Sequence, residues 1–237
     1  MSAKSVSRPR ARRLRLPAAL LSAAIATVFV TPAHAQTTTI AITGTAAPAP
    51  LAGAKFSTFG GPMLNNAGQV GFFGTLQTGV GGVTTSNDTA LFAGAPGALG
   101  LAAREGSAAP GAGAGAVFSS FSDIRFNGLG QLAFTGSLVV GTGGVTSSND
   151  HGIWAGGAGA VQLVAREGSA APGVSGATFN PNFEPPFQND TGETGFIGVL
   201  NSAIPARSAS PSARLTSLDS SQTTMAERSS WCLTRWG

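Results

Sequence analysis

The sequence is poor in the residues that supply most protein chemistry. Among 237 residues there are one cysteine, two histidines and no tyrosine, and charged residues make up only 10%. The single cysteine, Cys232, excludes an intramolecular disulfide and a cysteine-based metal site. If the protein is exported, its stability therefore has to come from a packed core rather than from cross-links.

Basic charge is scarce where a nucleic-acid surface would need it. Residues 1–35 carry six basic residues and no acidic one, whereas residues 36–200 carry four basic against eight acidic residues. The net charge of +4 therefore comes from the two ends of the chain, and the central region is mildly acidic. Because nucleic-acid binding requires a basic surface, the sequence predicts no nucleic-acid partner.

Long apolar runs are missing as well. The run at residues 17–30 is shorter than the ~20 residues that a membrane-spanning helix needs. It follows a basic segment and precedes Ala33-His34-Ala35, which is the order of a secretory signal peptide. We expect residues 1–35 to be cleaved and the protein to reach the periplasm, the cell surface or the extracellular space. An uncleaved membrane anchor is the alternative.

Glycine and proline are abundant, with 34 and 14 copies, which favours short strands joined by turns. An eight-residue pattern recurs at a fixed spacing of 62 residues, beginning at Asn65, Asn127 and Asn189. A fixed period of this kind indicates a tandem-repeat architecture. We divide residues 36–200 into three units, at about 38–98, 99–160 and 161–200, of which the third is truncated.

Each copy of the pattern begins with Asn-x-x-Gly and continues as a strand with alternating apolar residues. Asn and Gly tolerate the left-handed backbone of a tight turn, and the alternation buries one face of the strand. The glycines in the middle of these strands predict a bulge or the close approach of another backbone. The predicted structural residues are Asn65, Gly68 and Phe72, then Asn127, Gly130 and Phe134, then Asn189, Gly192 and Phe196, and the mid-strand glycines are Gly74, Gly136 and Gly198.

The predicted fold class is all-β, with four short strands in each unit. In the second unit we expect them at about residues 99–105, 121–126, 131–140 and 152–155. Four strands match the size of a propeller blade, but three units are too few to close a ring of the usual 4–8 blades. We therefore expect an incomplete, blade-like or stacked array, whose open sheet edges leave self-association open.

The pattern stops after Leu200. Periodicity requires another Ser-Asn-Asp near residues 210–212, but the chain reads Ser210-Pro211-Ser212. Residues 201–237 are rich in Ser and Arg and contain a single glycine. We interpret this segment as a non-repeat tail, disordered or produced by a frameshift or truncation, which would leave the third unit without its last strand.

Candidate chemical groups are few. His151, the only histidine after residue 35, could act with Asp150 as a base or ligand, although a solvated loop histidine is the simpler interpretation. Asp88 and Asp150 are weak candidates for metal ligation, and an Asx turn is the alternative. Arg104-Glu105 and Arg166-Glu167 could form a repeated charged pair between units, with each residue paired to a neighbouring strand, and a substrate carboxylate held by the two arginines is the alternative. We assign no catalytic residue, metal or cofactor, because the nucleophile-elbow, phosphate-loop and EF-hand patterns are absent.

The repeated motif resembles that of a family of exported bacterial tandem-repeat proteins named for Asn-x-x-Gly-x-x-Ala-Phe, which carry varied C-terminal anchors. Asn127, Gly130, Ala133 and Phe134 match it fully, and the other two copies have Gly in place of Ala. The resemblance implies an exported repeat protein and brings no catalytic residue. We expect a non-enzymatic structural or binding protein, for which a cell-surface glycan or protein could be a ligand, although the sequence identifies none. The alternative is a secreted hydrolase or lyase with its site on loops between repeats.

Overall fold

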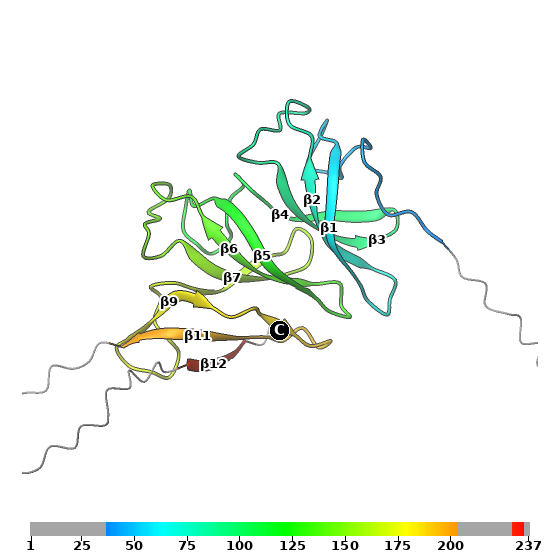
Figure 1. Cartoon of the computed structure of the whole chain (residues 1–237). Helices are drawn as coiled ribbons and strands as arrows, with labels where there is room; N and C mark the ends of the chain where they lie inside the picture. Colours follow the sequence, from blue (N-terminus) through cyan, green and yellow to red (C-terminus); the bar gives the residue numbers. More distant parts are fainter. Residues whose placement is uncertain (1–36, 203–228, 235–237) are drawn as a thin grey trace, which may run out of the picture. The chain divides into compact units, whose positions relative to one another are not determined.

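The computed structural model describes residues 37–202 and the strand at 229–234 (Figure 1). The expected signal peptide and most of the expected tail lie outside these residues. The described chain contains strands and turns without any helix, which confirms the predicted all-β class. No helix long and apolar enough to cross a membrane was found among the described residues.

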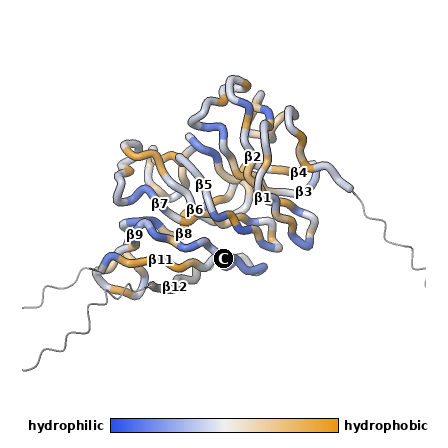
Figure 2. Tube along the Cα trace, in the orientation of Figure 1, coloured by the Kyte–Doolittle hydropathy of each residue, from blue (hydrophilic) through white to orange (hydrophobic). Residues whose placement is uncertain are grey.

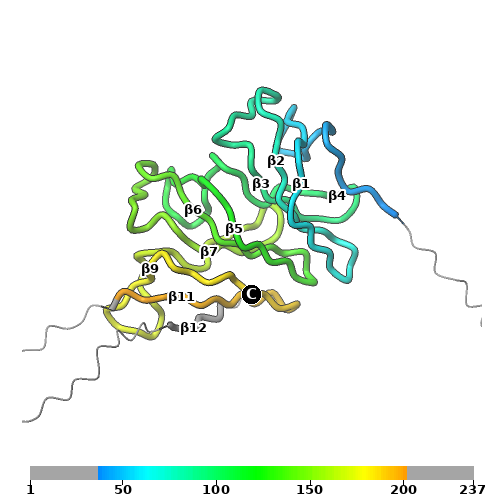
Figure 3. The backbone as a smooth tube through the Cα atoms, viewed as in Figure 1, coloured from blue at the N-terminus to red at the C-terminus, as the bar shows by residue number. Residues whose placement is uncertain are grey.

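The strands form three antiparallel sheets that follow one another along the chain (Figure 3). The first two have the strand orders β1-β2-β3-β4 and β5-β6-β7-β8, and in the third β11 pairs with β9 and β10 at one edge and with β12 at the other. The strands are β1 (Phe56–Leu64), β2 (Val70–Leu76), β3 (Thr89–Ala95), β4 (Ala98–Arg104), β5 (Phe118–Phe126), β6 (Leu132–Leu138), β7 (His151–Gly156), β8 (Gln162–Arg166), β9 (Ala177–Phe183), β10 (Phe187–Gln188), β11 (Thr194–Ser202) and β12 (Ser229–Thr234).

The boundaries of the sheets differ from the boundaries of the repeat units predicted from the sequence. The strand expected at residues 99–105 forms, but as β4 it closes the first sheet rather than opening the second. The remaining strands expected in the second unit are β5, β6 and β7. A repeat can be cut at any point of its period, and only the pairing of strands decides which residues share a sheet.

The third sheet differs from the other two in its third strand. Thr194 to Val199 of β11 pair with Thr234 to Ser229 of β12. The corresponding strands of the first two sheets begin at Thr89 and His151, and a further step of the period would begin a strand at residue 213. A counterpart of the fourth strands, β4 and β8, is absent from the described residues.

Each sheet carries a cluster of aromatic rings on one face, most of them buried and Phe59 exposed. The clusters are Phe56, Phe59, Phe72 and Phe92; Phe118, Phe121, Phe134 and Trp154; and Phe179, Phe183 and Phe196. The mid-strand glycines make room for these rings, since a Cβ atom at Gly136 would lie 3.0 Å from the Trp154 ring. The close approach predicted at these glycines is therefore that of an aromatic ring, not of a backbone.

The opposite faces of the first and second sheets pack into the core of the next repeat. Leu91 and Ala93 of β3 join the cluster around Phe134, and Ile153 of β7 joins the cluster around Phe196. Apolar residues are concentrated along the strands, whereas several connecting loops are hydrophilic (Figure 2). Neighbouring repeats thus share their hydrophobic cores, as stacking repeats must when one unit cannot bury its own faces.

Candidate functional site

The Asn-x-x-Gly turns form a hydrogen-bonded ladder from one repeat to the next. The Asn127 Oδ1 accepts from the backbone N–H groups of Leu129 and Gln131, at 3.1 and 2.9 Å. Its Nδ2 donates to the Gln131 side chain at 3.0 Å and to the Asn189 carbonyl, one period onward, at 3.1 Å. Asn127 is 3% exposed, so its amide is fully committed to these contacts.

Asn65 makes the same contacts one repeat earlier. Its Oδ1 accepts from the N–H groups of Ala67 and Gln69, and its Nδ2 donates to the Asn127 carbonyl at 3.0 Å. Each asparagine therefore holds its own turn with one amide atom and the following turn with the other. The ladder links consecutive repeats through equivalent atoms.

The turn glycines have the left-handed backbone that the motif predicts. Gly68, Gly130 and Gly192 have φ angles of 74°, 76° and 89°. A Cβ atom at Gly130 would lie 2.7 Å from the Gln69 Oε1, which belongs to the preceding repeat. Gly130 is therefore required by its own backbone angle, and a Cβ atom at this position would also displace the Gln69 side chain.

A second repeated feature is an arginine that binds the turn before the third strand of a sheet; we call this turn and the residues packed on it the corner. Arg166 donates from Nε to the Asn149 carbonyl at 2.6 Å and from a terminal nitrogen to the Asn149 Oδ1 at 3.0 Å. Its other terminal nitrogen donates to the Ala112 carbonyl at 2.6 Å. Arg104 makes the two equivalent bonds to Asn87. These guanidinium groups are engaged by their own chain, which favours the structural role over binding of a substrate carboxylate.

The turn expected at Asp88 and Asp150 is organised by the residue before each. The Asn87 Oδ1 accepts from the Thr84 N–H, and the Asn149 Oδ1 from the Thr146 N–H, both at 2.8 Å. This contact differs from the expected Asx turn, in which the side-chain oxygen bonds the backbone two residues onward, because the Oδ1 of each asparagine bonds a backbone N–H three residues earlier. The two aspartate side chains are left for other contacts.

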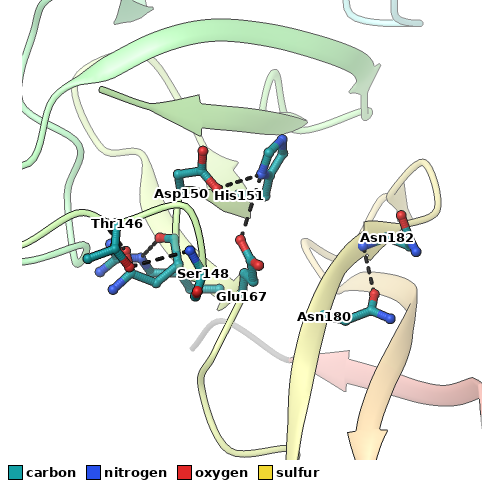
Figure 4. A network of polar contacts seen from close by, with 9 residues as sticks. Thr146, Ser148, Asp150, His151, Glu167, Asn180 and Asn182 are labelled. Carbon is teal, nitrogen blue, oxygen red and sulfur yellow. Dashed lines mark hydrogen bonds and ion pairs between the residues drawn. The ribbon is translucent and has the colours of Figure 1, made fainter. Parts of the chain in front are cut away.

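In the second sheet, Asp150 takes part in a compact cluster with His151 and Glu167 (Figure 4). The His151 Nδ1 lies 2.9 Å from the Asp150 Oδ1 and 3.7 Å from the Glu167 Oε2. One candidate ligand atom from each residue lies within 4.8 Å of the other two. Asp150 and His151 meet Glu167 because β7 pairs with β8, and the Glu167 N–H donates to the His151 carbonyl at 2.9 Å.

The three side chains differ in their access to water. The exposed fractions of the side chains are 39% for His151, 18% for Asp150 and 6% for Glu167. The Glu167 Oε2 is buried without a hydrogen-bond partner. Burial raises the pKa of Glu167, the Asp150 carboxylate raises it further, and His151 opposes the shift. The cluster thus combines a solvent-facing imidazole with a buried carboxylate oxygen that accepts no hydrogen bond from the described residues.

The first sheet has the same corner without the histidine. Thr89 replaces His151, and Glu105 stands at the place of Glu167. The Glu105 Oε2 accepts a hydrogen bond from the Thr89 N–H at 3.2 Å. Burial raises the pKa of Glu105, and the Thr89 N–H lowers it. The pair of acidic residues therefore occurs in both of the first two repeats, whereas the histidine occurs in the second alone.

Glu167 is the site residue that the sequence analysis missed. From the sequence alone, Glu167 is one half of the repeated Arg-Glu pair with Arg166. A signal was present, because Asp88 and Glu105 recur together as Asp150 and Glu167. Two acids that recur together and lie on paired strands of one hairpin can meet in space.

An apolar cleft on the first sheet offers less chemistry. It measures about 150 Å³ and is lined by Ile40, Ala41, Phe59, Pro62, Val70 and Phe72. None of these side chains can donate a proton, ligate a metal or act as a nucleophile. Among the described residues, the Asp150, His151 and Glu167 cluster is therefore the better candidate for a functional site.

Comparison with known proteins gives a family and no activity. No curated protein and no solved structure matches the chain. A family model described as a family of unknown function, DUF7453, matches residues 22–222, which is most of the chain. The chain therefore belongs to the DUF7453 family.

Proposed function

We propose that the protein is an exported, non-enzymatic structural or binding repeat protein of the cell surface or extracellular space. It belongs in this view to the tandem-repeat proteins named for Asn-x-x-Gly-x-x-Ala-Phe. The asparagine ladder is the observation that supports the proposal, because the signature residues of each motif hold the next repeat. Residues committed to stacking build a continuous surface and leave no side chain for catalysis in the motif.

Export is tested by the state of the protein in its own cells. N-terminal sequencing of the protein from the cell surface or the medium should begin at Gln36, after removal of residues 1–35. Antibody labelling of intact cells separates surface attachment from release into the medium. Recovery of the full chain with Met1 from the cytoplasm alone would contradict the proposal.

Binding is tested with the purified protein against cell-surface glycans and surface proteins of the same cells. We expect saturable binding to one of these classes and no turnover of it. Sedimentation of the protein alone shows whether it instead associates with itself through its sheet edges. A monomeric protein that binds neither class would oppose a binding role and leave the structural one.

A secreted hydrolase or lyase is the second candidate, and one observation favours it. The Asp150, His151 and Glu167 cluster places a solvent-facing imidazole beside a buried carboxylate, a combination used in acid–base catalysis. Release of product from glycan or ester substrates, abolished by His151→Ala, would establish this candidate and overturn the non-enzymatic proposal. The unchanged thermal midpoint of that variant would show that folding is not the cause.

A further inference from the structure

We propose that Asp150, His151 and Glu167 form a binding site for a divalent transition-metal ion of the zinc type. One nitrogen and two carboxylate oxygens would bind the ion, and its remaining positions would face solvent on the His151 side. The site exists in this proposal whether the repeats bind a glycan, bind a protein or only support a surface.

The spacing of the ligand atoms fits such an ion. Zinc lies about 2.0–2.2 Å from nitrogen and oxygen ligands, so two ligands at a tetrahedral angle are about 3.4 Å apart. The distances from His151 Nδ1 to Asp150 Oδ1 and Glu167 Oε2, 2.9 and 3.7 Å, lie on either side of that value. His151 and Asp150 are not fully buried, which leaves their side chains room to rotate and bring the two distances closer to that value.

The charge of the cluster also calls for a cation. When both carboxylates are ionised they repel each other in this partly buried site, and a buried charged carboxylate without a partner is costly. Arg166 gives no relief, because its donors go to Asn149 and Ala112. Within the described chain, the nitrogen within ion-pair distance of Glu167 is that of His151. A divalent cation between the three groups neutralises both carboxylates and supplies the missing partner of Glu167 Oε2.

The ligand types narrow the choice of ion. Calcium prefers six to eight oxygen ligands, and a nitrogen ligand is foreign to such sites. Imidazole favours zinc and its neighbours in the first transition row, which also accept carboxylate oxygens. The presence of His151 in one repeat therefore distinguishes a transition-metal site from the acid pair that both repeats possess.

The first sheet provides a matched control within the same molecule. Asp88 and Glu105 occupy the equivalent places, but Thr89 supplies no imidazole. Exchange of one residue in each direction should therefore remove the site or create a second one. His151→Thr gives the second sheet the residue that the first already has, and Thr89→His does the reverse.

The experiment uses the purified full chain without an affinity tag, stripped with EDTA and dialysed. Zn²⁺ binding is measured by isothermal titration calorimetry, and bound Co²⁺ is followed by its visible absorption spectrum. We expect one equivalent of Zn²⁺ in the parent, at least a tenfold weaker affinity in His151→Thr and Glu167→Gln, and two equivalents in Thr89→His. Ca²⁺ should not compete with Zn²⁺ at similar concentrations.

Three results would overturn the proposal. They are the absence of stoichiometric Zn²⁺ binding to the parent, unchanged affinity in His151→Thr, and Thr89→His that folds normally but gains no second equivalent. Thermal midpoints measured in EDTA identify any variant that fails to fold. If Glu167→Gln fails, Asp150→Asn replaces it, and the same loss of affinity is expected.

Discussion

The corners of the first two sheets are built alike and differ at one residue that changes their chemistry. Both have an arginine bound to an asparagine and an aspartate close to a glutamate. In the first corner the glutamate accepts from the Thr89 backbone, whereas in the second its counterpart has an oxygen without a partner beside His151. The first two repeats thus share the same arrangement of arginine, asparagine and two acidic residues. The residue that differs between them, His151, marks where a specific activity can be sought.

The largest effect is expected in the aromatic cores. Phe134 is fully buried, and Phe134→Ala should lower the free energy of unfolding by about 3–5 kcal/mol. Phe72, its counterpart in the first sheet, lines the apolar cleft, so Phe72→Ala should cost less. Urea denaturation of both variants measures the difference. Equal losses would mean that the cleft does not loosen the first core.

The turn glycines give the next effect. Gly68→Val and Gly130→Val both force a β-branched residue to a positive φ, at a cost of about 1–3 kcal/mol each. Gly130→Val should be the more harmful, because its Cβ atom meets the Gln69 side chain while the space at Gly68 is open. Thermal unfolding of the pair provides the measurement. A Gly68 variant as unstable as the Gly130 variant would contradict the contact between turns.

Loss of the asparagine ladder bond should lower the stability of the protein less than Gly130→Val does. Asn127→Ala removes an amide that is buried and leaves the Asn189 carbonyl without its donor, for which we expect about 1–3 kcal/mol. Hydrogen exchange should report the loss at two places, in the turn of Asn127 and in the turn that follows. Faster exchange confined to the Asn127 turn would show that the ladder does not couple repeats.

The smallest effect concerns pH. Burial raises the pKa of Glu105, so the folded state holds this proton more tightly than the unfolded state. The contribution of Glu105 to stability is therefore greatest below its unfolded pKa and is lost as the pH rises through the folded pKa. Relative to the parent, Glu105→Gln should gain stability as the pH rises from about 4 to 7. A constant difference in thermal midpoint over that range would contradict the raised pKa.

Local features of the fold were predictable from the sequence. The period of 62 residues and the alternation in the second strand of each sheet identify strands and turns. Strands and turns are predictable because they depend mainly on residues that are neighbours in the sequence. The position at which one sheet ends and the next begins was not predictable. The segment Leu99 to Arg104 is equally compatible with the first strand of one sheet and with the last strand of another. Strand pairing, a long-range property, decides between them.

The candidate site was half predictable for the same reason. Asp150 and His151 are adjacent in sequence, and their possible cooperation was evident. Glu167 joins them only through the pairing of β7 with β8, where a register shift lies between Ile153 and Trp154. A bulge of this kind changes which side chains face one another, and the alternation of a single strand does not reveal it.

The ladder has a consequence for how such chains evolve. The acceptor that each asparagine finds in the next turn is a backbone carbonyl, which every amino acid possesses. Recombination that duplicates or deletes whole units therefore keeps this bond without any compensating substitution in the acceptor residue. A unit can be gained or lost while the asparagine bond is kept, and a histidine in one copy leaves this bond untouched.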